Sequence, residues 1–583
     1  MSDRSRLPAT IRARVHDGAI DRVSRFFNAS VADAAAEIIQ NSRRSGATRL
    51  DVVTETIPER GTVVTVTDDG FGIADPAVLL SFGESGWDAA TARREDPAGM
   101  GVYALSKRGC VISSRPATAG IAPMPGWRVQ LTPECFLGKQ EAGIVACEDA
   151  PLPSGTAITF LADQSGEGIR AAFAAAARHC PLAVTVNGEA VARKAFLDGA
   201  VHVERWRGLS FGVFDSRFHG FNEPNLNFHG LSLSVFLPTV DTIDGGTWSV
   251  LGDVDACPEL ELVLPARREA VQTPFLDEMR KAARIAIYRA MRRADRTPAL
   301  AHNHFTAARE AGIDMPIAPA VLRPWRPGIA DIDDWRDTPS PEPVRPGTLV
   351  MAVDAEIQDQ QCFWRAAERD GIAGRLFEAD RRLEGYGWYD ALARVEGVRI
   401  DVTGAGVTHP LDALRAGEEP SADAATAPGL PDTLARPDAI HMHLNIVHRD
   451  GPPETIAVPA DVAFIGEEGT WVEDAHPLVT RDSDLQPSGL CQLLQAAYFS
   501  ASDDPDADSH ETQRRRFRED ATHLAIRLLA SEEEARRHTI AEAVWREILW
   551  VMPRDREVSI RVAAGKVAVE FGPEIPQPEG AAA

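Results

Sequence analysis

The sequence lacks the features that would place the chain in a membrane, on a secretory route or around a structural metal. No apolar run approaches the roughly 20 residues that cross a bilayer. The N-terminal stretch MSDRSRLPATIRARVHDG has neither an apolar core nor a small-residue cleavage site. The seven cysteines are odd in number and include no C-x-x-C pair, which argues against a zinc site and a disulfide framework. We therefore expect a cytoplasmic protein with reduced thiols and no membrane partner.

Positive charge is also scarce. The chain carries 61 Lys and Arg against 86 Asp and Glu, a formal net charge of −25. Such acidity disfavours non-specific binding to nucleic acid, although a local basic patch could override it. No repeat of fixed period is present. What is present is length: 583 residues exceed what one hydrophobic core can organise, so several domains are expected.

The order of helical and strand patterns suggests how the chain is divided. Alternating patterns predict an α/β layer at the N-terminus and a second α/β region after it. A Pro-rich stretch without clear periodicity then marks the sharpest boundary. The predicted divisions are residues 1–165, 166–315, a linker at 316–347, and a C-terminal region of unknown role at 348–583.

Several elements are predicted from local patterns. LDVVTET and TVVTVTDD alternate like paired strands, and Asn187-Gly188 is typical of a tight hairpin. An amphipathic helix is expected from Leu276. Near the end of the sequence, a long helical stretch from about Glu511 to Val551 precedes a closing hairpin, VSIRVAAGKVAVEF.

The segment AEIIQNS holds the first candidate chemistry. Ser30 can cap a helix that ends near Gly46. Glu37 and Asn41 are four residues apart on it, so their side chains share one face. A carboxylate can orient a water and an amide can ligate Mg²⁺, both needed for phosphoryl transfer to water. The same spacing also occurs on ordinary solvated helix faces.

The segment DDGFGI follows the TVVTVT strand directly. A carboxylate at a strand end, such as Asp68, can accept a hydrogen bond from an adenine amino group. Gly70 and Gly72 would let the backbone approach a ligand closely. The alternative interpretation is a tight acidic turn.

Two further segments could complete a nucleotide site. Residues 82–106 are polar and glycine-rich and lead through Gly99 and Gly101 into an expected helix, whose N–H groups could hold phosphate. The preceding loop is a plausible lid. In SGTAITFL, Thr156 could add a hydroxyl, although an ordinary strand start reads the same way.

In this order and at these separations, the four segments resemble the GHKL family, which includes gyrase, the ninety-kilodalton heat-shock chaperone, histidine kinases and MutL. The resemblance implies an α/β (α+β) chain with an N-terminal Bergerat sandwich that holds ATP beneath a lid, followed by a transducer-like domain. It matches Glu37 to the catalytic base, Asn41 to the Mg²⁺ ligand and Asp68 to the adenine-binding aspartate. The remaining matched positions are Gly70, Gly72, Gly99, Gly101 and Thr156.

The sequence departs from the family pattern in places. Gln40 stands where an Asp is common, and Arg43-Arg44 replaces the usual Asp-Ala. The glycine expected just before Gly99 is also missing, so the lid segment of this chain differs from that of the family.

A second resemblance concerns the segment RREAVQ. It is similar to a loop of the heat-shock chaperone's middle domain that sends an arginine to the γ-phosphate, which would make Arg268 an arginine finger. A fixed charge and a planar fork suit that task. Alternatively, Arg267 and Arg268 are solvated residues at a helix start.

The resemblance implies a slow, Mg²⁺-dependent ATP hydrolase that works as a conformational clamp, with a nucleotide-dependent homodimer and a possible protein client. A DNA-associated ATPase resembling MutL or MORC proteins is an alternative, and a nucleotide-sensing interaction module is another. The acidic charge makes nucleic acid the less favoured partner.

Two other patterns permit function but do not require it. His441 and His443 share a strand face, as metal ligands could, without an evident third ligand. Four arginines crowd one helix start at residues 514–518, which could contact nucleic acid or form a solvated, self-paired cluster.

Overall fold

The computed structural model describes residues 30–81, 86–87, 91, 99, 101–117, 125–215, 224–263, 269–331, 338–416, 436–466, 472, 475–502, 504, 507–553 and 556–574. The chain divides into two compact units, residues 1–318 and 319–583, and each unit is considered by itself below. Among these residues no helix is long and apolar enough to span a bilayer.

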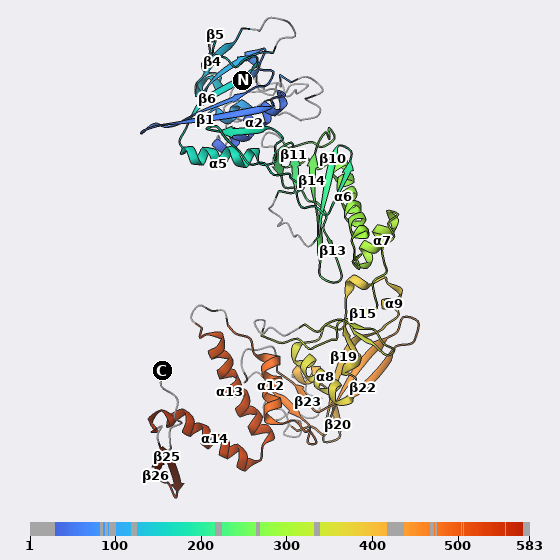
Figure 1. The fold of residues 1–583 in the computed structure, drawn as a ribbon. Coiled ribbons are helices and arrows are strands. Elements are labelled where there is room, and N and C mark those ends of the chain that lie inside the picture. Colours follow the sequence, from blue (N-terminus) through green and yellow to red (C-terminus); the bar gives the residue numbers. More distant parts are fainter. Residues whose placement is uncertain are drawn as a thin grey trace, which may run out of the picture. The chain divides into compact units, whose positions relative to one another are not determined.

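The first unit begins with a mixed sheet whose described strands run in the order β5-β4-β3-β6-β2-β1-β7-β8 (Figure 1). Neighbouring strands are antiparallel except β1 and β7, which are parallel. The strands are β1 (Arg49–Ile57), β2 (Gly61–Asp68), β3 (Cys110–Arg115), β4 (Trp127–Leu131), β5 (Ile144–Ala146), β6 (Gly155–Ala162), β7 (Ala183–Val186) and β8 (Glu189–Ala190). The predicted pair of strands on either side of the turn at residues 58–61 is therefore confirmed.

Helices α2 (Val31–Arg44) and α5 (Gly166–Ala177) pack against each other and share a buried core with this sheet. Ser30 begins α2, as predicted, because its hydroxyl accepts a hydrogen bond from the Asp33 N–H at 3.1 Å. Alternation in β2 sends every second residue, Asp68 included, to the buried face of the strand. The helix that carries Glu37 and the strand that carries Asp68 thus belong to two layers that share one core.

The division predicted at residue 165 falls inside this layer. The chain crosses through α5 and returns as β7, which pairs in parallel with β1. The predicted Asn187-Gly188 turn is present, with φ angles of 51° and 82°, and it joins β7 to β8. This hairpin therefore extends the first sheet and is not part of the second region, where the sequence pattern had placed it.

A second sheet follows in the same unit. Its described strands run β12-β11-β14-β10-β9, with β13 also paired to β14. The strands are β9 (His202–Trp206), β10 (Leu209–Asp215), β11 (Leu226–Phe228), β12 (Leu231–Leu233), β13 (Val240–Asp241) and β14 (Thr247–Val254). The predicted amphipathic helix is α6 (Pro274–Arg293), which packs on β9, β10 and β14, and α7 (His302–Glu310) follows it.

The second unit is built on a sheet with described strands in the order β18-β17-β19-β21-β22 and β20 beside β19. These are β17 (Leu349–Met351), β18 (Leu376–Glu378), β19 (Ala393–Gly404), β20 (Val407–Pro410), β21 (Ala439–Val447) and β22 (Glu454–Ala460). Helix α8 (Ile357–Asp370) packs on β22 and on α12 (Pro487–Tyr498), and both helices contribute to the unit's apolar core. The α/β class predicted for this region is confirmed.

The predicted long helical stretch at the end is two helices, α13 (His510–Leu529) and α14 (Glu532–Glu547). The break occurs where Ser531 caps α14 and Glu534 reaches back to the Ser531 N–H, a capping box that starts a new helix. The predicted closing hairpin is β25 (Arg556–Ala563) and β26 (Lys566–Glu574).

The other described elements are short. They are η2 (Pro76–Leu79), η3 (Gly101–Leu105), α4 (Pro133–Phe136), β15 (Val321–Leu322), β16 (Glu342–Pro343), η4 (Ala373–Arg375), η5 (Arg381–Leu383), α9 (Gly387–Asp390), α10 (Leu411–Arg415), β23 (Val462–Phe464), β24 (Pro477–Val479) and η7 (Leu549–Val551). In the Pro-rich stretch predicted as a linker, the described residues form only β15 and β16.

Candidate nucleotide site

A cavity of about 420 Å³ lies where α2 meets the end of β2 and the start of β6. Its volume is within the range of small-molecule sites. It brings together residues from every segment that the sequence singled out in the first domain. The predicted site residues that line it are Glu37, Asn41, Asp68, Gly72, Gly99, Gly101 and Thr156.

Asp68 lines the cavity and is 9% exposed. Its Oδ2 accepts a hydrogen bond from the Ser42 hydroxyl at 3.0 Å. Its Oδ1 accepts from the N–H groups of Gly70 at 2.9 Å and Thr156 at 3.3 Å. Burial raises the pKa of Asp68, against the lowering effect of these hydrogen bonds. The carboxylate is thus fixed in orientation, and Oδ2 retains a lone pair that can accept from a ligand.

The neighbouring Asp69 points to the other side of the strand. It accepts hydrogen bonds from the Thr48 N–H at 2.7 Å and the Arg49 N–H at 2.9 Å. Burial opposes its ionisation, but these bonds and the one from the Thr48 hydroxyl hold the pKa of Asp69 below its ordinary value. Asp69 therefore ties the end of β2 to the start of β1, and Asp68 alone of the pair faces the cavity.

Glu37 and Asn41 both line the cavity from α2. Gly101 lies against them: a Cβ at Gly101 would be 2.8 Å from Glu37 Oε2 and 3.0 Å from Asn41 Nδ2. A larger residue at this position would displace the ends of these two side chains, and glycine avoids that. The spacing of four residues on one helix face predicted this pairing.

The two glycines after Asp68 have different positions. Gly72 lines the cavity with φ of 68°, and a Cβ there would be 2.2 Å from the Arg115 carbonyl oxygen. Gly70 is outside the lining and packs on Ser45, where a Cβ would be 1.9 Å from the hydroxyl oxygen. Gly72 thus shapes the wall, and Gly70 allows the turn to pack on the end of α2.

Thr156 stands opposite Asp68 in the pairing of β2 and β6. Its hydroxyl is 3.0 Å from that of Ser114, and the Ser114 hydroxyl donates to the Gly155 carbonyl at 2.9 Å. Ser114 is fully buried and also accepts from the Ile73 N–H. No local pattern selects Ser114, because its relation to Thr156 depends on the pairing of β3 with β6.

The helix expected after Gly101 is instead the short 3-10 helix η3. Five residues with 3-10 geometry do not make the helix N-terminus that was predicted to hold phosphate. Tyr103 and Leu105 are buried in the core of the sheet layer, which fixes this turn by packing. Most of the predicted lid, between residues 82 and 100, lies outside the described residues.

The cavity also has apolar walls. It is lined by Ile38, Ile73, Val78, Leu79, Val102, Ile112, Ile158 and the aromatic pair Phe71 and Trp87. The two aromatic rings meet edge to face with centroids 5.8 Å apart. A planar heterocycle could be buried here with its polar edge toward Asp68.

Arg44 also lines the cavity, although in the sequence it stood out only as a departure from the family's usual Asp-Ala. It is 6% exposed, lines the cavity, and donates from Nη1 to Asn41 Oδ1 at 3.1 Å. Its positions three residues after Asn41 and seven after Glu37 on α2 would have placed it on their face. A fixed positive charge therefore lies beside the predicted metal ligand.

The protein oxygens at this site could bind Mg²⁺ only together with oxygens of a bound ligand. Asn41 offers one amide oxygen, which has a second lone pair beyond its bond to Arg44. No group of three His, Cys, Asp or Glu in the described ranges could hold a metal by itself. Mg²⁺ commonly binds through one or two protein oxygens and substrate phosphates, so the residues fit that arrangement.

Arg268, the predicted finger, lies outside the described residues, as does Arg267. The chain on either side is described: Leu262 and Ala270 form an isolated bridge, and the Val263 N–H donates to the Glu269 carbonyl at 2.9 Å. Residues 264–268 therefore join two paired segments in the second half of the first unit.

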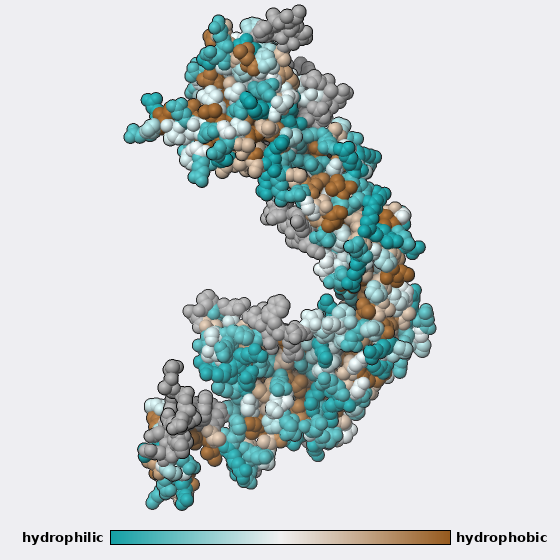
Figure 2. All heavy atoms as spheres, in the orientation of Figure 1, coloured by the Kyte–Doolittle hydropathy of each residue, from teal (hydrophilic) through white to brown (hydrophobic). Residues whose placement is uncertain are grey.

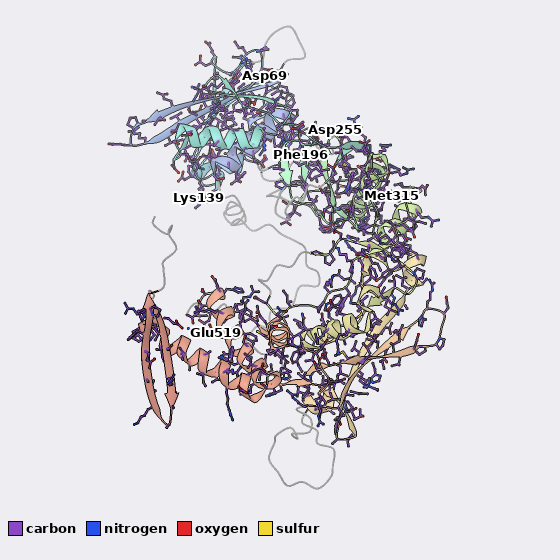
Figure 3. All side chains as sticks on the ribbon, turned by 60° about the horizontal axis from the view of Figure 1, so that its bottom comes forward. Asp69, Lys139, Phe196, Asp255, Met315 and Glu519 are labelled. Carbon is purple, nitrogen blue, oxygen red and sulfur yellow. The ribbon has the colours of Figure 1, made fainter. Side chains whose placement is uncertain are left out.

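Helix α2 also contacts the turn between β11 and β12 of the second sheet. Gln40 Nε2 donates to the His229 carbonyl at 2.8 Å, and Gly230 packs so closely on Cys180 that a Cβ would be 2.8 Å from its Cβ. Beside this contact, Phe196 and Asp255 line another cavity and lie near each other in Figure 3. The helix that carries Glu37 and Asn41 is thus in direct contact with the second sheet.

The two remaining sequence patterns do not form sites in the described ranges. His443 Nε2 lies 3.1 Å from Asp401 Oδ2, and no third metal ligand joins them. On α13, Arg516 pairs with Asp508, Arg515 with Glu519, and Arg518 with Gln495. Phe517 is buried in the core and cannot stack on a base. Figure 2 shows hydrophilic side chains gathered over α13. The ion pairs with Asp508 and Glu519 favour the solvated, self-paired interpretation.

No protein-family model matches the chain, and no curated protein matches it. Among solved structures, the chain is similar to the N-terminal domain of a DNA repair protein, with 11% identity and a TM-score of 0.27 over 45% of this chain and 97% of that one. It is also similar to the B-subunit of the DNA gyrase from Myxococcus xanthus, with 14% identity and a TM-score of 0.30 over 47% of this chain and 97% of that one. These TM-scores are too low to assign the chain to a family, so its function must be inferred from the site itself.

Proposed function

We propose that the chain binds ATP in the cavity of the first unit and hydrolyses it slowly in the presence of Mg²⁺. One observation carries this proposal: Glu37, Asn41, Asp68 and Thr156 come from three separate elements and line a single cavity of about 420 Å³. Apolar side chains line the same cavity, and Arg44 adds a positive charge beside Asn41.

The residues divide the chemistry among them. Asp68 Oδ2 accepts a hydrogen bond from the adenine amino group. Glu37 orients a water and takes its proton as the water oxygen bonds to the γ-phosphorus and the bond to ADP breaks. Asn41 would hold Mg²⁺ through its amide oxygen, and the bound ion would neutralise charge on the phosphates. Gly101 places backbone directly over Glu37 and Asn41, where it helps to exclude bulk water.

Hydrolysis is coupled to the second sheet. Gln40 lies on the same helix as Glu37 and is 4% exposed, and its bond to the His229 carbonyl joins that helix to the turn between β11 and β12. A shift of α2 on nucleotide binding would therefore move or break the hydrogen bond from Gln40 to the His229 carbonyl. We infer that the chain works as an ATP-driven conformational clamp of the kind seen in heat-shock chaperones, with a protein client.

Arg268→Ala should lower the turnover of ATP about tenfold or more and leave ADP affinity nearly unchanged. The physical reason is that a finger would touch only the γ-phosphate, where charge develops in the transition state. Steady-state hydrolysis and calorimetric titration with ADP measure the two quantities. Arg267→Ala is the matched control and should behave like the parent chain. If both Arg268→Ala and Arg267→Ala hydrolyse ATP at the parental rate, both arginines are solvated residues and neither is a finger.

ATP should also compact or associate the chain. With Mg²⁺-ATP, a hydrolysis-deficient Glu37→Gln chain should sediment faster than with ADP, because a closed clamp pairs two N-terminal domains. The net charge of −25 opposes that pairing, so closure should strengthen as salt rises. Contact with DNA would weaken as salt rises. Sedimentation at two salt concentrations, with and without duplex DNA, separates these results, and an unchanged sedimentation coefficient in all of them would rule out the clamp.

A further inference from the structure

The first unit holds another cavity, of about 680 Å³, beside the contact between α2 and the second sheet. Its volume is within the range of small-molecule sites. Three cationic side chains line it, and they come from two separate segments of the chain: Arg43 from α2, and Arg193 and Lys194 from the segment after β8. The chain as a whole carries a formal charge of −25, so this cavity is a local exception to its acidity.

The segment that carries Arg193 and Lys194 is bonded to the turn between α5 and β7. The Lys194 N–H donates to the Arg178 carbonyl at 2.8 Å, and the Lys194 carbonyl lies 2.8 Å from His179 Nδ1. Arg193 Nη1 donates to the Pro181 carbonyl at 2.6 Å, and its guanidinium has four further N–H donors. These contacts fix the segment before any ligand binds, which lowers the entropy cost of binding.

Arg43 lines the cavity from the helix that also carries the proposed nucleotide ligands. Three residues earlier, Gln40 donates to the His229 carbonyl, so residues 40 and 43 share the face of α2 that meets the second sheet. Glu37 and Asn41 line the nucleotide cavity. One helix therefore contributes to both cavities, through neighbouring faces.

The two carboxylates in the lining each have a partner. Asp253 Oδ1 accepts a hydrogen bond from Asn227 Nδ2 at 2.7 Å, and Asp255 pairs with Arg205 at 2.8 Å. Together with Arg205, the lining carries four positive charges against two negative ones. An anion is therefore the ligand that these charges attract.

We propose that this cavity binds the phosphate groups of a small phosphorylated molecule. Arginine suits this ligand because its planar fork matches phosphate oxygens, and lysine adds a point charge. The organic part of the ligand would pack on Phe196, whose ring meets that of His179 edge to face at 5.0 Å and which lies near Asp255 in Figure 3. Walls from α2, the α5–β7 turn and the end of β14 enclose a small molecule better than the extended backbone of a nucleic acid.

Occupancy of this cavity should also affect nucleotide binding, a consequence that rests on the proposed function. Both ligands are anions and would lie beside neighbouring faces of α2, so their charges repel each other. Each should therefore weaken the binding of the other, and linkage requires the same factor in both directions.

The test is calorimetric titration of the full chain with inorganic pyrophosphate, after ADP has saturated the nucleotide cavity. The parent chain should bind pyrophosphate. Arg193→Gln should lower the affinity about tenfold, the scale expected for loss of one charge-assisted contact. Lys194→Gln should weaken binding in the same way. Both residues are exposed, so both variants should fold, and thermal unfolding of each would verify this.

Arg178→Gln is the matched control. Arg178 is exposed and belongs to the same turn, but it is not part of the cavity lining. The variant loses an equal charge, and its affinity for pyrophosphate should stay within about twofold of the parental value because solvent and salt screen exposed charges. Equal weakening in Arg178→Gln and Arg193→Gln overturns the proposal, since the effect would then be one of general charge.

Two further outcomes would also overturn the proposal. One is a parent chain that does not bind pyrophosphate, including the case where it binds duplex DNA through Arg193 instead. The other is an apparent ADP affinity that keeps falling as pyrophosphate rises, equally in the parent and in Arg193→Gln, because pyrophosphate would then compete for the nucleotide cavity. The expected result is a fall of at least about twofold that levels off. A chain that binds no ADP contradicts the proposed function, and dependence of pyrophosphate binding on Arg193 would still support this site.

Discussion

Glu37→Gln should bind ATP with nearly parental affinity and hydrolyse it about 10² times more slowly or worse, the usual scale for loss of a general base. Glutamine keeps the length and shape of the side chain beneath Gly101, so the cavity should not be repacked. It cannot take a proton from the attacking water, and that is the role assigned to Glu37. Calorimetric titration with ATP and a phosphate-release assay measure the two expectations on the same preparation.

A carboxylate on the sheet that α2 packs against provides the control. Glu55 on β1 is exposed and is not part of the cavity lining. Glu55→Gln makes the same chemical change and should leave both affinity and turnover as in the parent. If Glu37→Gln and Glu55→Gln hydrolyse ATP at equal rates, Glu37 is not the base.

Part of this site could be predicted because it depends on local rules. Ser30 fixes where α2 begins, and the helical period then places Glu37 and Asn41 on one face. Period-two alternation in β2 likewise determines that Asp68 faces the core and Asp69 does not. Each of these inferences needs only neighbouring residues, so a single sequence contains the information.

The rest depends on partners far away in the sequence. The Asn187-Gly188 turn was recognisable, but its sheet was not, because β7 pairs with β1, more than a hundred residues earlier. Ser114 belongs to the site only through the pairing of β3 with β6. The turn after Gly101 became η3 and not a longer helix, since Tyr103 and Leu105 are held in the core of the sheet layer. Tertiary packing decided each of these, and no local pattern reports it.

Asp68→Asn should weaken ATP binding about 10–100-fold, the range expected when a buried hydrogen-bonding group is left mismatched. The reason lies in the three hydrogen bonds that fix the carboxylate. Oδ1 must remain an oxygen, because it accepts from the N–H groups of Gly70 and Thr156. The new amide nitrogen must then replace Oδ2. The Ser42 hydroxyl can rotate to accept from it, but an adenine amino group would face it as a second donor. Calorimetry with ATP and ADP should show the same loss for both nucleotides.

Two comparisons make the role of Asp68 specific. Asp69→Asn can keep an oxygen that accepts from the Thr48 and Arg49 N–H groups, but it loses the negative charge that strengthens these bonds, so it should lower the unfolding temperature with little change in affinity. The pH dependence gives the second comparison. Burial raises the pKa of Asp68, and ATP requires its ionised form as the acceptor. Parental affinity should therefore fall as pH decreases through that raised pKa, at a higher pH than an ordinary carboxyl would cause. Asp68→Asn has no proton to gain there, so its weaker affinity should lose this pH dependence. A parallel decline in parent and variant would place the titrating group elsewhere and remove Asp68 from the adenine contact.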